Sequence, residues 1–475
     1  MYVIFFKKGV KIVVFSSLTF LCLFLPIVLI VYMLRRSINY KNAVIAIASL
    51  VFYAWGEPSF LILLIAASLI NYMLALAMDR ARAAGRDKLI LGAAIAFDII
   101  MIGVFKYAGF AVSSINGVFR TALPVPQIGL PLGISFYTFQ ILTYVVDVYR
   151  GDTPVQKSYL KFLTFVSMFP QLIAGPIVRY SEVAVNLDNR KTTVQDFADG
   201  STQFVLGLSK KVFLANFAGE AKDLLFSAAT HPTVLSSWLG IIFYSLQLYF
   251  DFAGYSDMAI GMGRMLGFRF PKNFDYPYIS KSITEFWRRW HMTLGSFFRD
   301  YVYIPLGGNR CAKWRWLMNT MIVWMLTGLW HGASWNFVLW GLYYGVLLII
   351  EKLFFKKWSK LPVLPHITTM FLVVLGWGLF YFTDFSELAQ FIGHLFGRGC
   401  ELYDFTTISA FCSYSVLLAA CILVSTPLPY NIYKKLISIG KVGWIIEAAI
   451  MCALFIGCIA LLTGATSNPF LYFRF

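Results

Sequence analysis

The stretch that decides the fold is WLMNTMIVWMLTGLWHGASWNFVLWGLYYGVLLII, residues 316–350. As one continuous helix it would measure about 52 Å, whereas the hydrocarbon core of a bilayer is about 30 Å thick. The run must therefore break, and the small residues Gly332-Ala333-Ser334 are its weakest point. Lys and Arg flank both ends, so we predict two helices that enter and leave on one side of the membrane and meet at His331.

The whole chain has the composition of a polytopic all-α membrane protein. Of its 475 residues 59% are hydrophobic and only 13% are charged, because a surface that faces lipid needs no polar cover. We predict a single membrane domain, 1–475, with ten to twelve membrane segments. Besides 316–350, the apolar runs lie near 12–34, 42–55, 59–78, 89–105, 128–148, 159–178, 235–260, 368–383, 411–426 and 444–463. The polar interval 181–199 is the predicted surface loop.

The net charge of +17 does not indicate a nucleic-acid partner. The Lys and Arg residues lie in short loops between apolar runs, which is typical of cytoplasmic loops in membrane proteins. The most basic stretch, 264–315, is therefore predicted to lie at the cytoplasmic face. The seven cysteines form no C-x-x-C pair, so the sequence predicts neither a disulfide framework nor a metal site.

His331 is the first candidate for chemistry. An ionisable side chain within the membrane costs several kcal/mol unless it lines a cavity or finds a partner, so it is a functional candidate. A neutral imidazole in apolar surroundings can act as a general base. The alternative is a hydrogen-bonded histidine of the protein core, and the sequence leaves it open.

A second candidate, His291, lies in TEFWRRWHMTLGSFFRDY, residues 284–301. Read as one helix, this stretch places its aromatic residues on one face and Arg288, Arg289 and Arg299 on the other, with His291 at the boundary. Such a helix lies in the membrane interface. It is either an anchor with an interfacial histidine, or its arginines face an anionic donor and the histidine approaches a buried site.

Three acidic residues, Asp98, Asp251 and Asp257, also fall within apolar runs. We expect them to be hydrogen-bond partners in helix packing, and the alternative is that they line a tunnel. The sequence contains neither G-x-x-x-x-G-K-[ST] nor G-x-S-x-G, which argues against ATP-driven transport and a serine-elbow hydrolase.

Several stretches together resemble the membrane-bound O-acyltransferase family, in its bacterial branch that acylates alginate and other polysaccharides. They include PLGISFYTFQILTYVVDVYRG (131–151), FPQLIAGPIVRY (169–180), EFWRRWHMTLGSFFRDYVYIPLGGNR (285–310) and LTGLWHGASWNFVLWGLYYG (326–345). The resemblance implies a ring of membrane helices, with re-entrant and interfacial helices, around a central tunnel. It also implies a catalytic core at about 131–350.

The same resemblance implies roles for individual residues. His331 in LWHG matches the invariant histidine of the family, and His291 in RWHMTL matches its second active-site position. The carboxy-terminal stretch NPFLYFRF (468–475) resembles an aromatic signature of this branch. Within it, Tyr472 is either an acyl-carrying or acyl-positioning hydroxyl, or an aromatic anchor at the membrane interface. The phosphates of the donor are expected near Arg288, Arg289 and Arg299.

The function implied is O-acylation of an extracytoplasmic, alginate-like polysaccharide from a cytosolic thioester, with acetyl-CoA as the expected donor. No metal or redox cofactor is expected. An esterase-like transferase outside the bacterial plasma membrane is the expected partner. D-alanyl transfer to teichoic acid and O-acetylation of peptidoglycan remain as alternatives, and so do two roles without catalysis, an acyl-donor transporter and a scaffold of an envelope complex.

Overall fold

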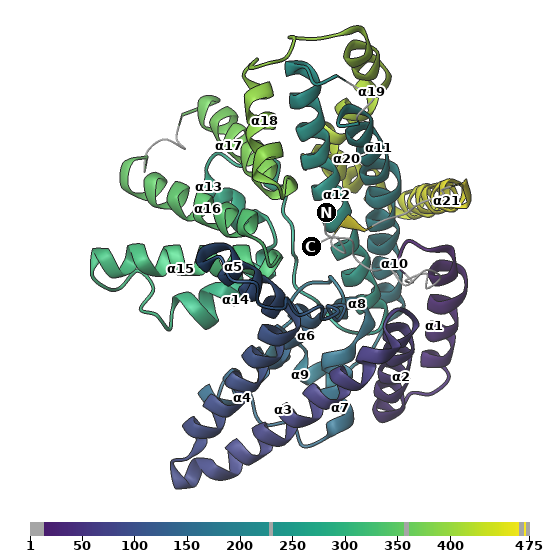
Figure 1. Ribbon diagram of the computed structural model, residues 1–475. Coiled ribbons are helices and arrows are strands. Elements are labelled where there is room, and N and C mark those ends of the chain that lie inside the picture. Colours follow the sequence, from purple (N-terminus) through teal and green to yellow (C-terminus); the bar gives the residue numbers. More distant parts are fainter. Residues whose placement is uncertain (1–13, 228–230, 356–360, 465–469, 472–475) are drawn as a thin grey trace. The chain divides into compact units, whose positions relative to one another are not determined.

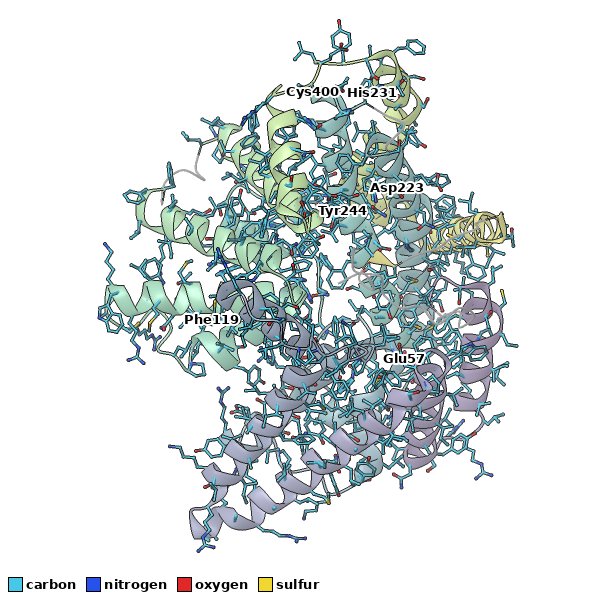
Figure 2. The ribbon with its side chains drawn as sticks, in the orientation of Figure 1. Glu57, Phe119, Asp223, His231, Tyr244 and Cys400 are labelled. Atoms are coloured by element: carbon cyan, nitrogen blue, oxygen red, sulfur yellow. The ribbon has the colours of Figure 1, made fainter. Side chains whose placement is uncertain are left out.

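The structure is a computed structural model that describes residues 14–227, 231–355, 361–464 and 470–471 (Figure 1). Within these ranges the chain is helical, apart from connecting segments and one isolated bridge between Thr233 and Glu401. The predicted all-α class is confirmed. Next to this bridge, the N–H groups of Val234 and Leu235 donate to the carbonyl oxygens of Glu401 and Leu402. Figure 2 labels His231 and Cys400, which lie close to these residues in the sequence.

The described chain forms two compact units. The first contains the residues up to Phe204 and Ser256–Pro271; the second contains Val205–Tyr255 and the described residues between Lys272 and Leu471. The boundary falls within two helices, α10 (Val194–Ser209) and α12 (Val234–Met265). The other helices of the first unit are η1 (Phe20–Phe24), α1 (Leu25–Met33), α2 (Ile38–Gly56), η2 (Pro58–Phe60), α3 (Leu61–Ala81), η3 (Arg82–Ala84), α4 (Asp87–Ile102), η4 (Gly103–Tyr107), α5 (Ala108–Phe119), α6 (Ile134–Arg150), α7 (Tyr159–Ser167), α8 (Phe169–Leu172) and α9 (Tyr180–Asp188).

The second unit holds the remaining helices. They are η5 (Lys210–Ala215), α11 (Asn216–Leu225), η6 (Pro277–Ile279), α13 (Ile283–Arg289), α14 (Met292–Phe298), η7 (Arg299–Tyr303), α15 (Lys313–His331), α16 (Trp335–Phe354), α17 (Leu364–Tyr381), α18 (Phe385–Leu395), α19 (Phe405–Val424), α20 (Leu428–Ile437) and α21 (Gly440–Gly464).

Six helices of the described chain are long and apolar enough to cross a membrane. They are Pro58–Ala84, Asp87–Phe119, Trp335–Phe354, Leu364–Tyr381, Phe405–Val424 and Gly440–Gly464, and Phe20–Met33 is a shorter apolar helix. The other predicted segments are also helical, but they are shorter or less apolar. The run 159–178 is divided into α7 and α8 just before Pro170, which lacks the N–H that a continuing helix needs.

Helix α6 forms the centre of the first unit, where it packs against α3, α4, α7 and α9. Most of its residues are buried, including polar side chains such as Gln140 and Thr143. Gly133 precedes it with φ at 71°, and a Cβ there would lie 2.6 Å from the carbonyl oxygen of Leu172. Only glycine fits this left-handed position and close backbone approach.

The predicted surface loop at 181–199 is wrong. The structure has α9 over most of it, and α10 begins at Val194. The polar residues are helix caps: Glu182 accepts the Arg179 N–H at 2.9 Å, and Thr193 Oγ1 accepts the Asp196 N–H at 3.0 Å. These polar side chains accept hydrogen bonds from free backbone N–H groups at the starts of two helices, so they do not indicate a loop.

Helices α15 and α16 form a closely packed hairpin, and they lie side by side in Figure 1. Glycines permit this approach. A Cβ on Gly328 would collide with the carbonyl oxygen of Phe337, and one on Gly341 with that of Trp324. Small residues of this kind allow the backbones of membrane helices to touch.

We expect Gly341→Ala to destabilise the protein by about 1–3 kcal/mol, because the added methyl group must push the two backbones apart. The melting temperature in detergent measures the effect. Gly92→Ala in α4 is the matched control, since no atom of the described residues lies within 4 Å of a Cβ at that position. Equal melting temperatures for the two variants would contradict the close approach.

Candidate active site

The chain breaks after His331, as the sequence predicted. Helix α15 ends at this residue and α16 begins at Trp335, with Gly332-Ala333-Ser334 between them. Gly332 is extended, and a Cβ there would collide with the ring of Phe337. The break therefore leaves His331 at the end of a helix that is packed against its neighbour.

Aromatic rings surround His331. The centres of the Trp330, Trp340 and Phe380 rings lie 4.8, 5.0 and 5.2 Å from the centre of its imidazole, each nearly perpendicular to it. The residue is 8% exposed, so it is enclosed but not fully sealed. The imidazole is thus fixed in a largely apolar setting.

His291 also lies at a helix break, which corrects the sequence prediction. We predicted one amphipathic helix over 284–301, but the structure has two short helices, α13 and α14, that are separated at Trp290 and His291. His291 adopts a left-handed conformation with φ at 46°. The Met292 N–H donates to the carbonyl oxygen of Asn273 at 2.9 Å, which holds the break in place. His291 is 2% exposed, so it is not an interfacial side chain.

The hydrogen bonds around Asn273 define the tautomer of His291. Asn273 Oδ1 accepts from the Thr293 N–H at 3.3 Å and from Thr293 Oγ1 at 3.0 Å, so it is an acceptor. His291 Nδ1 lies 3.1 Å from the same oxygen and must donate to it. The acceptor lone pair therefore resides on Nε2, which is buried and has no hydrogen-bond partner among the described residues.

Burial lowers the pKa of His291 to about 3. Desolvation disfavours the imidazolium ion, and no acidic partner offsets that effect. His291 is consequently neutral at physiological pH and can accept a hydrogen bond or a proton at Nε2.

The two histidines are 40 positions apart in the sequence and share one aromatic neighbour. The Trp330 ring centre lies 5.6 Å from that of His291 and 4.8 Å from that of His331. On its other side, His291 contacts Phe252 of α12 at 4.7 Å between ring centres. The structure therefore brings both predicted residues into one aromatic cluster of the second unit, where proton transfer and oxyanion stabilisation are chemically feasible.

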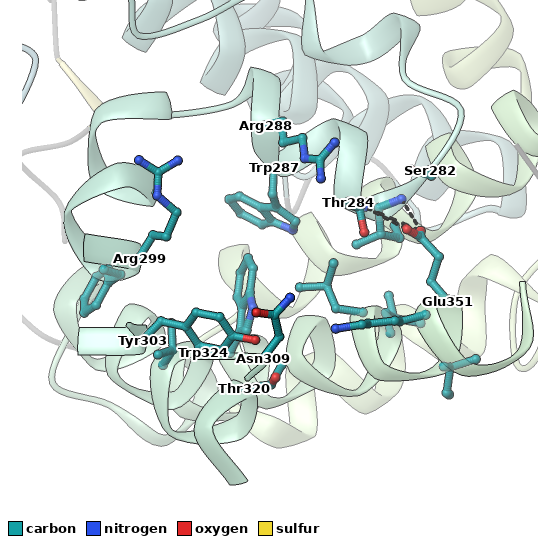
Figure 3. Close-up of a pocket in the computed structure, with 18 of the residues that line it drawn as sticks. Ser282, Thr284, Trp287, Arg288, Arg299, Tyr303, Asn309, Thr320, Trp324 and Glu351 are labelled. Carbon is teal, nitrogen blue, oxygen red and sulfur yellow. Dashed lines mark hydrogen bonds between the residues drawn. The ribbon is translucent and has the colours of Figure 1, made fainter. Parts of the chain in front are cut away.

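A cavity of about 1180 Å³ lies in the same unit (Figure 3). Arg288 and Arg299 line it, whereas Arg289 does not. Arg288 forms no ion pair with another described residue, and Arg299 is paired with Asp300 at 2.6 Å. Arg289 instead binds Glu285, 2.9 Å away.

The wall of this cavity is fixed by a carboxylate that the sequence analysis missed. Glu351, near the end of α16, accepts the N–H of Ile283 at 2.6 Å and that of Thr284 at 3.2 Å. It thus caps the start of α13, which carries Trp287 and Arg288 into the cavity wall, as Figure 3 shows. Asn273 was missed as well, because neither residue belongs to a periodic pattern.

Two of the three aspartates of the apolar runs have the packing role that was expected. Asp98 accepts from Asn71 Nδ2 at 2.8 Å, and Asp257 accepts from Gln203 Nε2 at 3.4 Å. Tyr472 lies outside the described residues. Among the residues that the structure covers, no group of three or more His, Cys, Asp or Glu side chains could hold a metal ion.

Comparison with known proteins places the chain in a family. The profile of the membrane-bound O-acyltransferase family matches residues 153–388. A protein of Pseudomonas putida named probable alginate O-acetylase AlgI is 38% identical over 97% of this chain and 100% of its own length. The chain belongs to the membrane-bound O-acyltransferase family. It is therefore a multi-pass membrane enzyme that transfers acyl groups to oxygen.

Two further proteins resemble the chain at lower identity. The peptidoglycan O-acetyltransferase of Helicobacter pylori is 33% identical over 78% of this chain and 77% of its own length. The teichoic acid D-alanyltransferase of Bacillus subtilis is 33% identical over 54% of this chain and 70% of its own length. The names of these relatives refer to alginate, peptidoglycan and teichoic acid.

Proposed function

We propose that the protein moves an acetyl group from a cytosolic thioester to the hydroxyl groups of an extracytoplasmic, alginate-like polysaccharide. The observation that carries the proposal is the placement of His331 at a helix break, against the same indole as the neutral His291. The long match to a probable alginate O-acetylase supports the choice of polymer. We propose the plasma membrane of a bacterium as its location, which the bacterial source of this relative supports.

The chemistry is a single acyl transfer. The imidazole of His331 takes the proton of the acceptor hydroxyl, while the oxygen of that hydroxyl attacks the carbonyl carbon of the thioester. The C–O bond forms and the C–S bond breaks, and the leaving thiolate takes the proton back from the imidazolium ion. The neutral Nε2 of His291 accepts a hydrogen bond from the acceptor hydroxyl and orients it. The reaction needs no redox change.

The proposed donor site is the cavity lined by Arg288 and Arg299. A guanidinium group pairs well with the phosphates of coenzyme A, and the basic stretch 264–315 is the one predicted to face the cytoplasm. Acetyl-CoA is therefore the donor that we propose. The immediate acceptor hydroxyl belongs to the polymer, to a partner protein or to Tyr472. In the last two cases an extracytoplasmic esterase-like transferase then passes the acetyl group to the polymer.

The test of this function is an assay of the purified protein in vesicles with acetyl-labelled coenzyme A. We expect release of free coenzyme A that depends on a hydroxyl acceptor, with label recovered as an oxygen ester. The acceptor is identified by supplying an alginate oligomer, peptidoglycan and teichoic acid in turn. Each is supplied together with a cell fraction that contains the expected esterase-like partner. Label that crosses the membrane with its thioester intact would indicate a transporter and refute the enzyme assignment for this donor.

Arg288→Ala should raise the KM for acetyl-CoA about tenfold with little change in kcat, because one charge-assisted hydrogen bond to phosphate is lost. The steady-state rate of thiol release measures this change. Acetyl-pantetheine, which lacks the phosphates, should show no difference between the variant and the wild type.

Arg310→Ala is the matched control for Arg288→Ala. Arg310 is exposed on the same basic stretch but does not line the cavity, so its loss changes net charge equally without removing a cavity contact. If both variants raise the KM to the same extent, the effect is general electrostatic attraction and the cavity is not the donor site.

A further inference from the structure

A buried ion pair in the second unit is left unexplained by the proposed chemistry. Lys211 Nζ lies 2.8 Å from Asp251 Oδ1, and both side chains are at most 5% exposed. Lys211 belongs to η5, a π-helical segment, and Asp251 lies in the middle of α12. Buried ion pairs contribute little net stability, so their retention points to a role in specificity or position.

The second oxygen of Asp251 holds the carboxy-terminal segment of this chain. Asp251 Oδ2 accepts the backbone N–H of Leu471 at 2.7 Å. The ring of Phe470 stacks on that of Tyr255, with 4.4 Å between their centres. Phe470 and Leu471 are 3% and 4% exposed, so this part of the segment is seated inside the unit.

The seat lies on a helix that also contacts the histidine cluster. Asp251 and Tyr255 are four residues apart on α12 and share one face. Phe252 and Tyr249 are three residues apart on the neighbouring face, where Phe252 contacts His291 and Tyr249 lies 6.1 Å from Trp290 between ring centres. About two turns of α12 therefore hold Phe470 and Leu471 on one face and the wall of the histidine site on the neighbouring face.

The backbones that carry Lys211 and Asp251 pack closely against each other at Gly254. A Cβ on Gly254 would lie 2.6 Å from the carbonyl oxygen of Gly207 and 3.1 Å from the Lys211 nitrogen. This contact leaves Lys211 and Asp251 little freedom to separate. One oxygen of the carboxylate thus pairs with Lys211 while the other accepts the Leu471 N–H.

We infer that the side chain of Asp251 is a clamp that seats Phe470 and Leu471 on α12 beside the histidine site, that Lys211 neutralises its buried charge, and that acyl transfer depends on this seating. The inference rests on the proposed function. Asp251 acts as a positioning residue, because it binds Leu471 and not the reacting atoms.

Two double variants separate the clamp from the ion pair. Lys211→Met with Asp251→Asn removes both charges but keeps a carbonyl oxygen for the Leu471 N–H. Lys211→Met with Asp251→Leu removes both charges and that acceptor as well. Neither leaves an unpaired buried charge, so both should fold.

The readouts are hydrogen–deuterium exchange in the peptide that contains Leu471, and the kinetics of acyl transfer. With the leucine variant we expect about tenfold faster exchange and about tenfold lower kcat, with an unchanged KM for the thioester donor. With the asparagine variant, the exchange rate and kcat should both stay within about threefold of wild type. Melting temperatures of the two variants should agree, which excludes a difference in global stability.

Wild-type exchange in the leucine variant would overturn the clamp, and faster exchange with unchanged kcat would overturn its role in transfer. Loss of kcat in both variants alike would show that the charges matter and the seating does not. Because exchange is measured without any substrate, a failure of the proposed function leaves this readout intact. If the proposed function is wrong, neither the wild type nor the two double variants transfer an acyl group, but the two variants still differ in their exchange rates.

Discussion

His331→Ala should lower the rate of acyl transfer by about 10³-fold, the typical contribution of a positioned general base. The imidazole is held at the break between α15 and α16 by three aromatic rings, and the proposed chemistry has no other proton acceptor at that position. The measurement is kcat for thiol release from acetyl-CoA by purified protein. The KM for the donor should change little, because the proposed phosphate contacts lie elsewhere.

His231→Ala is the control for this variant, since His231 is exposed and belongs to neither aromatic contact of the candidate site; Figure 2 labels it. It should retain the wild-type rate. His331→Gln tests whether a polar side chain of similar size preserves the fold without supplying a base; we expect it to melt like wild type and to be as inactive as the alanine variant. A fully active His331→Ala protein would remove His331 from the chemistry.

His291→Ala should lower kcat by about 10²-fold, the range seen when one preorganised group of an active site is lost. Its Nε2 is buried, neutral and without a partner among the described residues, which is the state that a group needs in order to meet substrate. The KM for the donor should stay within about twofold of wild type, because the interaction is made with the reacting atoms. Single-turnover kinetics separate this step from binding.

Asn273→Leu provides the companion test for His291. It removes the acceptor of the Nδ1 proton but leaves the imidazole in place, so the proton can shift between the two nitrogens. We expect a loss of about tenfold, smaller than that of His291→Ala. If Asn273→Leu is severe and His291→Ala is mild, the region matters through its fold and His291 is not part of the site.

The break at His331 could be predicted because the length of the apolar run alone requires it. A continuous helix over 316–350 is too long for the bilayer, and only one cluster of small residues lies near its middle. The two helices of this run, α15 and α16, consequently match the prediction closely. The all-α membrane class followed from composition for a similar reason, since a chain so poor in charge cannot cover a soluble surface.

The break at His291 could not be predicted in this way. The periodicity of 284–301 fits a helix throughout, and nothing local shows that His291 adopts a left-handed conformation. The break is held by Asn273, which is 18 residues away, and a helical projection does not include such a contact. For the same reason the distinction between Arg288 in the cavity wall and Arg289 in an ion pair became visible only in three dimensions.

A structure with a non-cleavable thioether analogue of acetyl-CoA tests the central claim most directly. We predict that the coenzyme A phosphates contact Arg288 and Arg299, and that the carbon in the place of the thioester carbonyl lies beside His331, leaving room for an acceptor oxygen about 3 Å from the imidazole. If the acyl end binds away from His331 and the imidazole remains closed off by Trp330, Trp340 and Phe380, His331 is not the catalytic base and the account is contradicted.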